Sequence, residues 1–133
     1  MTETRIVVPF PPSSNHYWRR VTIKGRQRVL ISKRGREYRT QVYGYCLQRK
    51  PRKKLHGTLA CTLDLYPPTA AVRDSDNFSK ALLDALTYGG VYEDDSQIKD
   101  KRTRMFPRVP PGIAVITLWN IEPLELPEVL PRL

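Results

Sequence analysis

The chain has few cysteines and histidines and a deficit of acidic residues. Its 133 residues include only two cysteines and two histidines. Cys46 and Cys61 do not form a C-x-x-C pair, and neither His16 nor His56 has partners at zinc-site spacing, which argues against a structural zinc site. We therefore expect buried free thiols in a reducing compartment rather than a disulfide.

Long hydrophobic runs are also missing. No stretch approaches the roughly 20 apolar residues of a transmembrane helix, so we expect no membrane association. The N-terminus lacks the basic-then-apolar pattern of a secretory signal, which predicts a cytoplasmic protein. A hydrophobic content of 40% is sufficient for one globular domain with one core.

What the chain has in excess is positive charge. Lysine and arginine total 23 against 13 aspartate and glutamate residues, giving a formal net charge of +10. Such an excess in a small domain indicates a polyanionic partner, usually nucleic acid. The alternative is a protein that is basic without binding a polyanion.

Apolar patterns predict both strands and helices. Strands are predicted at 5–10, 59–65, 98–106 and 113–119, and a hairpin at 21–31. Ser32 should cap a helix that ends near Leu47, with Tyr38, Val42, Tyr45 and Cys46 facing the core. Residues 48–54 should form a solvated basic loop, and a Pro-rich tail over 123–133 should follow a single domain at 1–122.

A further helix is the most regular prediction of all. Its buried stripe consists of Phe78, Ala81, Leu82, Ala85 and Leu86. Aspartates lie at both of its ends: Asp74 and Asp76 precede it, and Asp94 and Asp95 follow Gly89 and Gly90, which should stop it. If the chain folds back after this helix, the four carboxylates can converge.

Converging carboxylates predict a divalent-metal site that cuts nucleic acid. Crowded carboxylates repel one another, and a hard cation such as Mg²⁺ relieves that repulsion. Lys80 could then stabilise transition-state charge or orient water, while Arg73 and Asn77 could hold phosphates. The alternative is structural: the aspartates cap the helix and form a turn, and Lys80 pairs with Asp76 or Asp84.

Aromatic and basic residues alternate near the start of the chain. Tyr17 and Trp18 lie beside Arg19 and Arg20, a combination that can stack on bases and pair with phosphates. The same aromatics could instead belong to the core at a strand edge. The basic tip of the hairpin at 21–31 could embrace DNA or could be an ordinary solvated turn.

The order of these motifs resembles that of the RusA-type Holliday junction resolvases, small endodeoxyribonucleases often carried by phages and prophages. The resemblance consists of R-D-S-D-N-F-x-K-A-x-x-D-A-L at 73–86 and G-V-Y-x-D-D-x-Q-I at 90–98. A second match is P-F-P-P-S-S-N at 9–15, followed by Tyr17, Trp18 and Arg19. Together these segments span most of the chain.

The resemblance implies a fold, a reaction and a site. It implies an α/β fold of the α+β type, with a mixed sheet of about four to five strands and two main helices, in a homodimer that cuts four-way DNA symmetrically with Mg²⁺ or Mn²⁺ in a bacterial or phage-infected cell. The metal-site positions fall on Asp74, Asp76 and Asp95, and the essential lysine falls on Lys80. Two-fold symmetry would supply two active sites for two nicks.

DNA contacts are expected from three places in the chain. These are Asn15, Tyr17 and Arg19 near the start, Arg73 and Asn77 beside the acidic cluster, and Lys99, Lys101 and Arg102 after it. Resolvases of this type can carry a run of arginines before the first acidic residue, where this chain has only Arg73. Some phosphate contacts could therefore be lost or be supplied by Lys99, Lys101, Arg102 and Arg104. Two alternatives stay open: a non-catalytic nucleic-acid-binding module, and a nuclease for other branched DNA.

Overall fold

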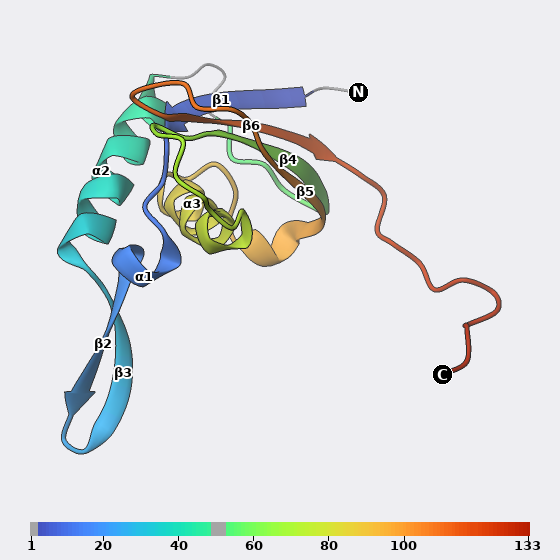
Figure 1. Ribbon diagram of the computed structural model, residues 1–133. Coiled ribbons are helices and arrows are strands. Elements are labelled where there is room, and N and C mark those ends of the chain that lie inside the picture. Colours follow the sequence, from blue (N-terminus) through green and yellow to red (C-terminus); the bar gives the residue numbers. More distant parts are fainter. Residues whose placement is uncertain (1–2, 49–52) are drawn as a thin grey trace.

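A computed structural model describes residues 3–48 and 53–133 (Figure 1). The predicted basic loop at 48–54 lies largely outside them. The elements in order are β1 (Glu3–Pro9), α1 (Ser14–Tyr17), β2 (Trp18–Ile23), β3 (Arg26–Ile31), α2 (Lys33–Leu47), β4 (Leu59–Tyr66), α3 (Asp76–Tyr88), the 3-10 helix η1 (Asp95–Gln97), β5 (Ile98–Met105) and β6 (Ile113–Asn120).

Four strands form one mixed sheet in the order β1-β6-β4-β5. Strand β4 pairs parallel with β5 and antiparallel with β6, which also pairs antiparallel with β1. A parallel pair needs a long crossover, and here the connection between β4 and β5 contains α3. The predicted mixed sheet with two main helices is confirmed.

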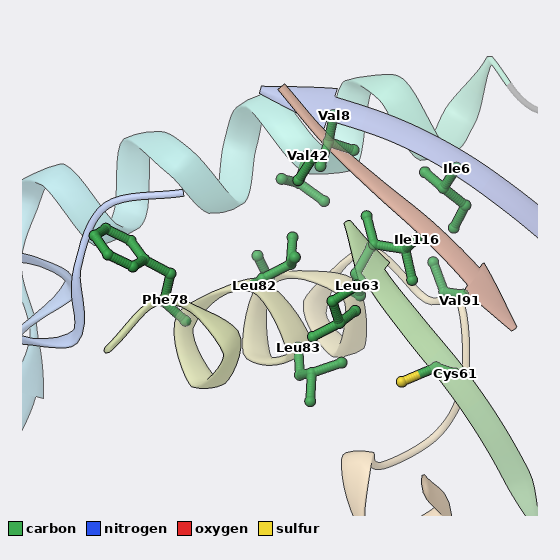
Figure 2. Close-up of a cluster of buried hydrophobic side chains, with 14 of the residues drawn as sticks. Ile6, Val8, Val42, Cys61, Leu63, Phe78, Leu82, Leu83, Val91 and Ile116 are labelled. Atoms are coloured by element: carbon green, nitrogen blue, oxygen red, sulfur yellow. The ribbon is translucent and has the colours of Figure 1, made fainter. Parts of the chain in front are cut away.

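Side chains that alternate along β4 give the sheet one apolar face. Leu63 and Leu65 are fully buried on it, whereas Asp64 between them and Tyr66 after them are only partly buried. Helix α3 packs its predicted stripe against this face, and α2 packs beside α3 and β1. Figure 2 shows side chains from α3, α2 and the sheet gathered between these elements, among them Leu82, Val42 and Ile116.

Strands β2 and β3 form a separate two-stranded hairpin that projects away from the sheet (Figure 1). The predicted hairpin is therefore confirmed, and Lys24 and Gly25 make its turn with φ of 51° and 75°. Both central residues have positive φ, as the tight turns that match the strand twist require. The hairpin leads directly into α2.

Helix α2 begins as predicted, because the Ser32 hydroxyl accepts a hydrogen bond from the Gly35 N–H at 3.0 Å. Tyr38 and Val42 are buried on its inner face. The prediction that Tyr45 also faces the core is wrong, since this side chain is 47% exposed. The helix is covered on one narrow stripe only, and Tyr45 lies outside it.

The chain after β6 has no regular secondary structure and extends away from the sheet (Figure 1). Its apolar side chains are exposed, among them Leu126 at 81% and Val129 at 82%. Within residues 3–48 and 53–133, no helix is both long and apolar enough to cross a membrane.

Candidate active site

One side of α3 is mostly polar and faces a pocket. Asp76, Ser79, Lys80 and Leu83 all line one pocket, and their spacing of three, four and seven residues places them on a single helical stripe. Asp76 lies in the first turn of the helix, where the N-terminal end of the helix dipole favours a negative charge.

The opposite wall consists of η1 and the start of β5. Asp95, Ile98, Lys99 and Lys101 line the same pocket, whose volume is about 460 Å³. We call it the central pocket. The central pocket therefore brings two aspartates and three lysines together from α3, η1 and β5.

A set of buried anchors directs this return. Gly90 has a φ of 77°, a conformation that L side chains rarely adopt. The fully buried Tyr92 donates a hydrogen bond from its hydroxyl to the Leu83 carbonyl at 2.6 Å. Burial raises the pKa of Tyr92 well above its ordinary value. The phenol therefore stays protonated and fixes the chain after α3 to the helix itself.

Asp94 and Gln97 hold η1. The Asp94 carboxylate accepts a hydrogen bond from the Ser96 N–H at 3.2 Å, and hydrogen bonding to the Ser96 side chain and then to this N–H lowers the pKa of Asp94. The Gln97 side chain accepts from the Asp94 N–H at 3.0 Å and donates to the Gly57 carbonyl at 3.0 Å. Asp94 is therefore used in the turn, whereas its neighbour Asp95 lines the pocket.

A second hollow adjoins the central pocket. It is lined by Ser14, Asn15, Trp18, Arg19, Arg20, Val29 and Lys80, and its volume is about 700 Å³. We call it the hairpin groove, since most of its lining comes from α1 and the β2–β3 hairpin. Lys80 lines both hollows, and its Nζ lies 5.2 Å from the centre of the Trp18 ring.

A family model described as endodeoxyribonuclease RusA matches residues 9–117. The chain belongs to the RusA family. It is 37% identical over 122 residues to a crossover junction endodeoxyribonuclease of Enterobacteria phage HK97, with 92% of this chain and 98% of the relative covered.

Bacterial relatives in the family are similar over the same length. The chain is 32% identical to a crossover junction endodeoxyribonuclease of Shigella sonnei strain Ss046 and 31% identical to one of Escherichia coli strain K12. Each match spans 121 residues, which is 91% of this chain and 98% of the relative. The resemblance drawn from the sequence motifs is thereby confirmed.

The RusA-like motifs divide into anchored residues and residues that line the hollows. Asp84, Tyr92, Asp94 and Gln97 have hydrogen-bond partners inside the protein. Within the described parts of the chain, by contrast, the carboxylates of Asp76 and Asp95 accept no hydrogen bond. Lys80 forms no ion pair with any residue described, so the alternative that it pairs with Asp76 or Asp84 is wrong.

Asp84 has a different partner. Its carboxylate accepts hydrogen bonds from the Tyr17 hydroxyl at 2.5 Å and from Arg39 Nη2 at 2.7 Å. Burial and the bond to Asp84 raise the pKa of Tyr17. Burial alone would lower the pKa of Arg39, but its bonds to Asp84 and Tyr17 outweigh that effect and raise it.

The prediction that Tyr17 contacts DNA is wrong for this fold. Its side chain is fully buried, and the hydrogen bond to Asp84 uses its hydroxyl. The aromatic residue that lines the hairpin groove is its neighbour Trp18, which is partly buried. Tyr17 is the last residue of α1 and Trp18 is the first of β2, so the change from helix to strand at this point directs one aromatic to the core and the next to the groove.

Other predicted DNA contacts are separated from the central pocket. Arg73 donates hydrogen bonds from its guanidinium to the Thr69 and Ala71 carbonyls at 2.9 and 3.0 Å, and so folds back on its own loop. Arg102 is exposed on β5, in register with Thr62, and does not line the central pocket, whereas the preceding Lys101 does. Asn77 is exposed at the start of α3 but lines neither hollow.

Asp74 lies next to the central pocket in sequence rather than in its lining. Its carboxylate accepts a hydrogen bond from the Asp76 N–H at 3.1 Å, but the residue at the N-cap of α3 is Ser75, with no side-chain cap hydrogen bond, so the expectation that Asp74 or Asp76 caps the helix is wrong. Sequence reasoning missed Ser14 and Val29 of the hairpin groove and the Tyr17–Asp84–Arg39 cluster. The period-2 spacing of Trp18 and Arg20 was the one available signal.

The donor chemistry of the central pocket suits a hard divalent cation. No group of three His, Cys, Asp or Glu side chains poised for a metal occurs among residues 3–48 and 53–133. Two carboxylates nevertheless meet in the pocket, and Mg²⁺ is usually held by one or two carboxylates together with waters and substrate phosphates. Asp76 and Asp95 therefore fit a magnesium ion whose remaining ligands would be waters and a phosphate of the substrate.

Proposed function

We propose that this chain is a crossover junction endodeoxyribonuclease that hydrolyses phosphodiester bonds in four-way branched DNA. The observation that carries the proposal is the meeting of Asp76, Lys80 and Asp95 in one pocket. Membership of the RusA family over nearly the whole chain supports it. The net charge of +10 suits a polyanionic substrate.

Asp76 and Asp95 would hold Mg²⁺ or Mn²⁺, with Asp74 two residues away as a further carboxylate. The ion, when bound, lowers the pKa of a water molecule and polarises the phosphodiester. Hydrolysis would add water across one P–O bond, leaving a phosphate on one strand end and a hydroxyl, which takes a proton from the water, on the other. The carboxylates of Asp76 and Asp95 are available to hold the ion, since neither accepts a competing hydrogen bond in the parts of the chain that are described.

Lys80 would stabilise the negative charge that develops on the phosphate oxygens. Its ammonium lies at the boundary of the central pocket, on the helical stripe that also carries Asp76. Lys99 and Lys101 face the same pocket from β5 and would hold the backbone phosphate next to the one that is cut. Positive groups thus surround the two carboxylates on several sides.

We further propose that the enzyme acts as a homodimer in the cytoplasm of a bacterial or phage-infected cell. Resolution of a two-fold symmetric junction requires two nicks, and a two-fold dimer supplies two central pockets in matching orientation. Light scattering of the purified protein at micromolar concentration would measure the mass, with about twice 15.4 kDa expected.

The decisive experiment incubates the protein with a synthetic four-way junction, with Mg²⁺ or with EDTA. We expect paired nicks that need Mg²⁺ and that Asp76→Asn abolishes, while junction binding persists. Asp100→Asn is the matched control, because Asp100 is exposed on β5 and does not line the pocket. It carries the same charge change and should cut normally.

Binding without any metal-dependent product would instead identify a non-catalytic nucleic-acid-binding module. Wild-type rates in Asp76→Asn would remove the central pocket from the reaction. The same assay with flaps and replication forks ranks the substrates, and faster cutting of those would assign the chain to other branched DNA.

A further inference from the structure

We infer that the hairpin groove is the subsite for the nucleotide next to the cleaved phosphate, and that the base of this nucleotide leaves the stack and lies on Trp18. This inference rests on the proposed cleavage of DNA in the central pocket. It adds a residue that binds a base, and a position at which the enzyme can distinguish one sequence from another.

The location of the groove decides which part of the DNA it can hold. Lys80 lines both the groove and the central pocket, so the two hollows share one side chain as their boundary. Consecutive nucleotides of a DNA strand are joined through a single phosphate, so a phosphate in the central pocket brings its own nucleotides to the boundary of that pocket. A strand with one phosphate in the central pocket therefore has its neighbouring nucleotide at the groove.

The groove has the composition of a nucleotide site. Its lining contains an aromatic ring, two arginines and two small polar side chains, and no acidic residue. Single-stranded nucleic acid is bound by such combinations, with bases stacked on aromatics and phosphates held by cations. Its volume of about 700 Å³ lies in the range of small-molecule sites.

The hairpin presents Trp18 together with two further groups. Trp18 pairs with Ile31 and Arg20 pairs with Val29 across the two strands, so all four side chains lie on one face. Val29 is 62% exposed and lies directly opposite Arg20, which is also exposed. An apolar surface and a cation thus lie side by side, matching the flat base and the phosphate of one nucleotide.

The Trp18 ring rests on a rigid support. The Tyr17 ring meets it edge to face, with centroids 4.4 Å apart. The hydrogen bond from the Tyr17 hydroxyl to Asp84 fixes Tyr17 to α3, the helix that also carries Lys80 and Asp76. A base on Trp18 would therefore be held at a defined position relative to the central pocket.

A base on Trp18 also changes the environment of Lys80. In the free protein the ammonium lies over the indole ring, where the ring face attracts a cation. A stacked base occupies that face and displaces the ammonium toward the phosphate in the central pocket. The exposed Asn15 amide, which offers both a donor and acceptor, can then read the edge of the base.

The test combines variants of Trp18 with junctions that lack one base. Trp18→Leu removes the aromatic surface and Trp18→Phe keeps it, while Trp119→Phe is the matched control because Trp119 lies in β6 and lines neither hollow. Each of the two nucleotides that flank the cleaved phosphate is replaced in turn by an abasic site. Circular dichroism establishes that each variant is folded.

We expect one abasic position to weaken binding of the wild type, in metal-free buffer, by roughly 5- to 100-fold, the range measured for loss of one base–aromatic stack. Trp18→Leu should bind the intact junction more weakly by about the same factor, and the abasic site should not weaken its binding any further. Trp18→Phe should recover most of the loss. The fluorescence of 2-aminopurine at the same position should be quenched by the wild type and by Trp119→Phe, and not by Trp18→Leu.

The inference would be overturned if, at both flanking positions, the loss of binding caused by Trp18→Leu multiplied the loss caused by the abasic site, because the base and the Trp18 ring would then act independently. Unchanged 2-aminopurine fluorescence in the wild type would do the same. Both readouts are binding measurements without metal. A protein that quenches the probe but never cuts would refute the proposed cleavage alone, and one that cuts without any coupling would refute the base subsite alone.

Discussion

The Tyr17–Asp84–Arg39 cluster connects the hairpin, α2 and α3, and Asp84→Ala tests what it contributes. The variant leaves the hydroxyl of the fully buried Tyr17 without its acceptor. Leaving a buried donor unsatisfied costs about 1–3 kcal/mol. The Arg39–Asp84 ion pair adds little, because both side chains are more than a quarter exposed at 27% and 29% and water can replace the lost partner.

We therefore expect Asp84→Ala to lose about 2 kcal/mol of stability. Globular proteins unfold with an entropy of roughly 2.1 cal/mol/K per residue, or about 280 cal/mol/K for the 133 residues of this chain. The melting temperature should then fall by about 7 °C, measured by circular dichroism or calorimetry at neutral pH.

Two companion variants make the reasoning refutable. Asp84→Asn keeps an acceptor for the Tyr17 hydroxyl and should lose less than half as much as Asp84→Ala. Tyr17→Phe combined with Asp84→Ala removes donor and acceptor together and should be more stable than Asp84→Ala alone, because no buried hydroxyl is left without a partner. A double variant as unstable as the sum of its parts would refute the account.

Three further predictions follow from other parts of the molecule. Lys80→Met should reduce cleavage by roughly 100-fold or more with little effect on junction binding, since an electrostatic contact to the transition state is lost; rates equal to wild type would exclude Lys80 from the reaction. Gly35→Ala should destabilise the protein by about 1–3 kcal/mol, because the new Cβ would lie 2.3 Å from the Tyr17 carbonyl oxygen. Gly44→Ala has no atom within 4 Å of the new Cβ and should stabilise α2 by about 0.5–1 kcal/mol. Urea titration would compare the two variants, and equal changes in unfolding free energy would contradict the packing argument. Burial raises the pKa of Cys61 from 9.0 to about 11 and also raises the pKa values of Tyr17, Tyr38 and Tyr92. The folded state therefore keeps protons that the unfolded state releases, so stability should be complete below pH 9 and fall as the pH rises above it. Tyrosinate absorbance should show these three phenols ionising only as circular dichroism is lost, and their ionisation in the folded protein would contradict their burial.

The sequence by itself was sufficient for the main elements of the fold. Alternation along β4, the helical stripe of α3 and the cap at Ser32 are local patterns. Such patterns can be predicted from the sequence because side-chain direction follows from the period of the backbone alone. The motifs at 73–86 and 90–98 were likewise sufficient for the family. Asp74, Asp76, Lys80 and Asp95 could all be named before any coordinates.

Local patterns could not assign an individual side chain to the core or to a hollow. Tyr17 and Trp18 are adjacent aromatics in the same basic segment, and only the packing of α1 against α2 and α3 determines that the first is buried and the second lines a groove. Asp84 was an obvious partner for Lys80 by helical spacing, yet Arg39 from α2 reaches it instead. Competition between partners depends on distances that arise only when helices pack.

The sequence determined which chemical groups this protein has and in what order, because composition and period are properties of the chain. Tertiary structure alone decided that Asp76 and Asp95 share a pocket, that Asp94 serves its own turn, and that Lys80 stands between two hollows. The physical reason is that these meetings require the chain to reverse after α3. That reversal is held by the buried hydroxyl of Tyr92, which bonds back to Leu83 within α3, and by the side chain of Gln97, which bonds to Gly57 before β4.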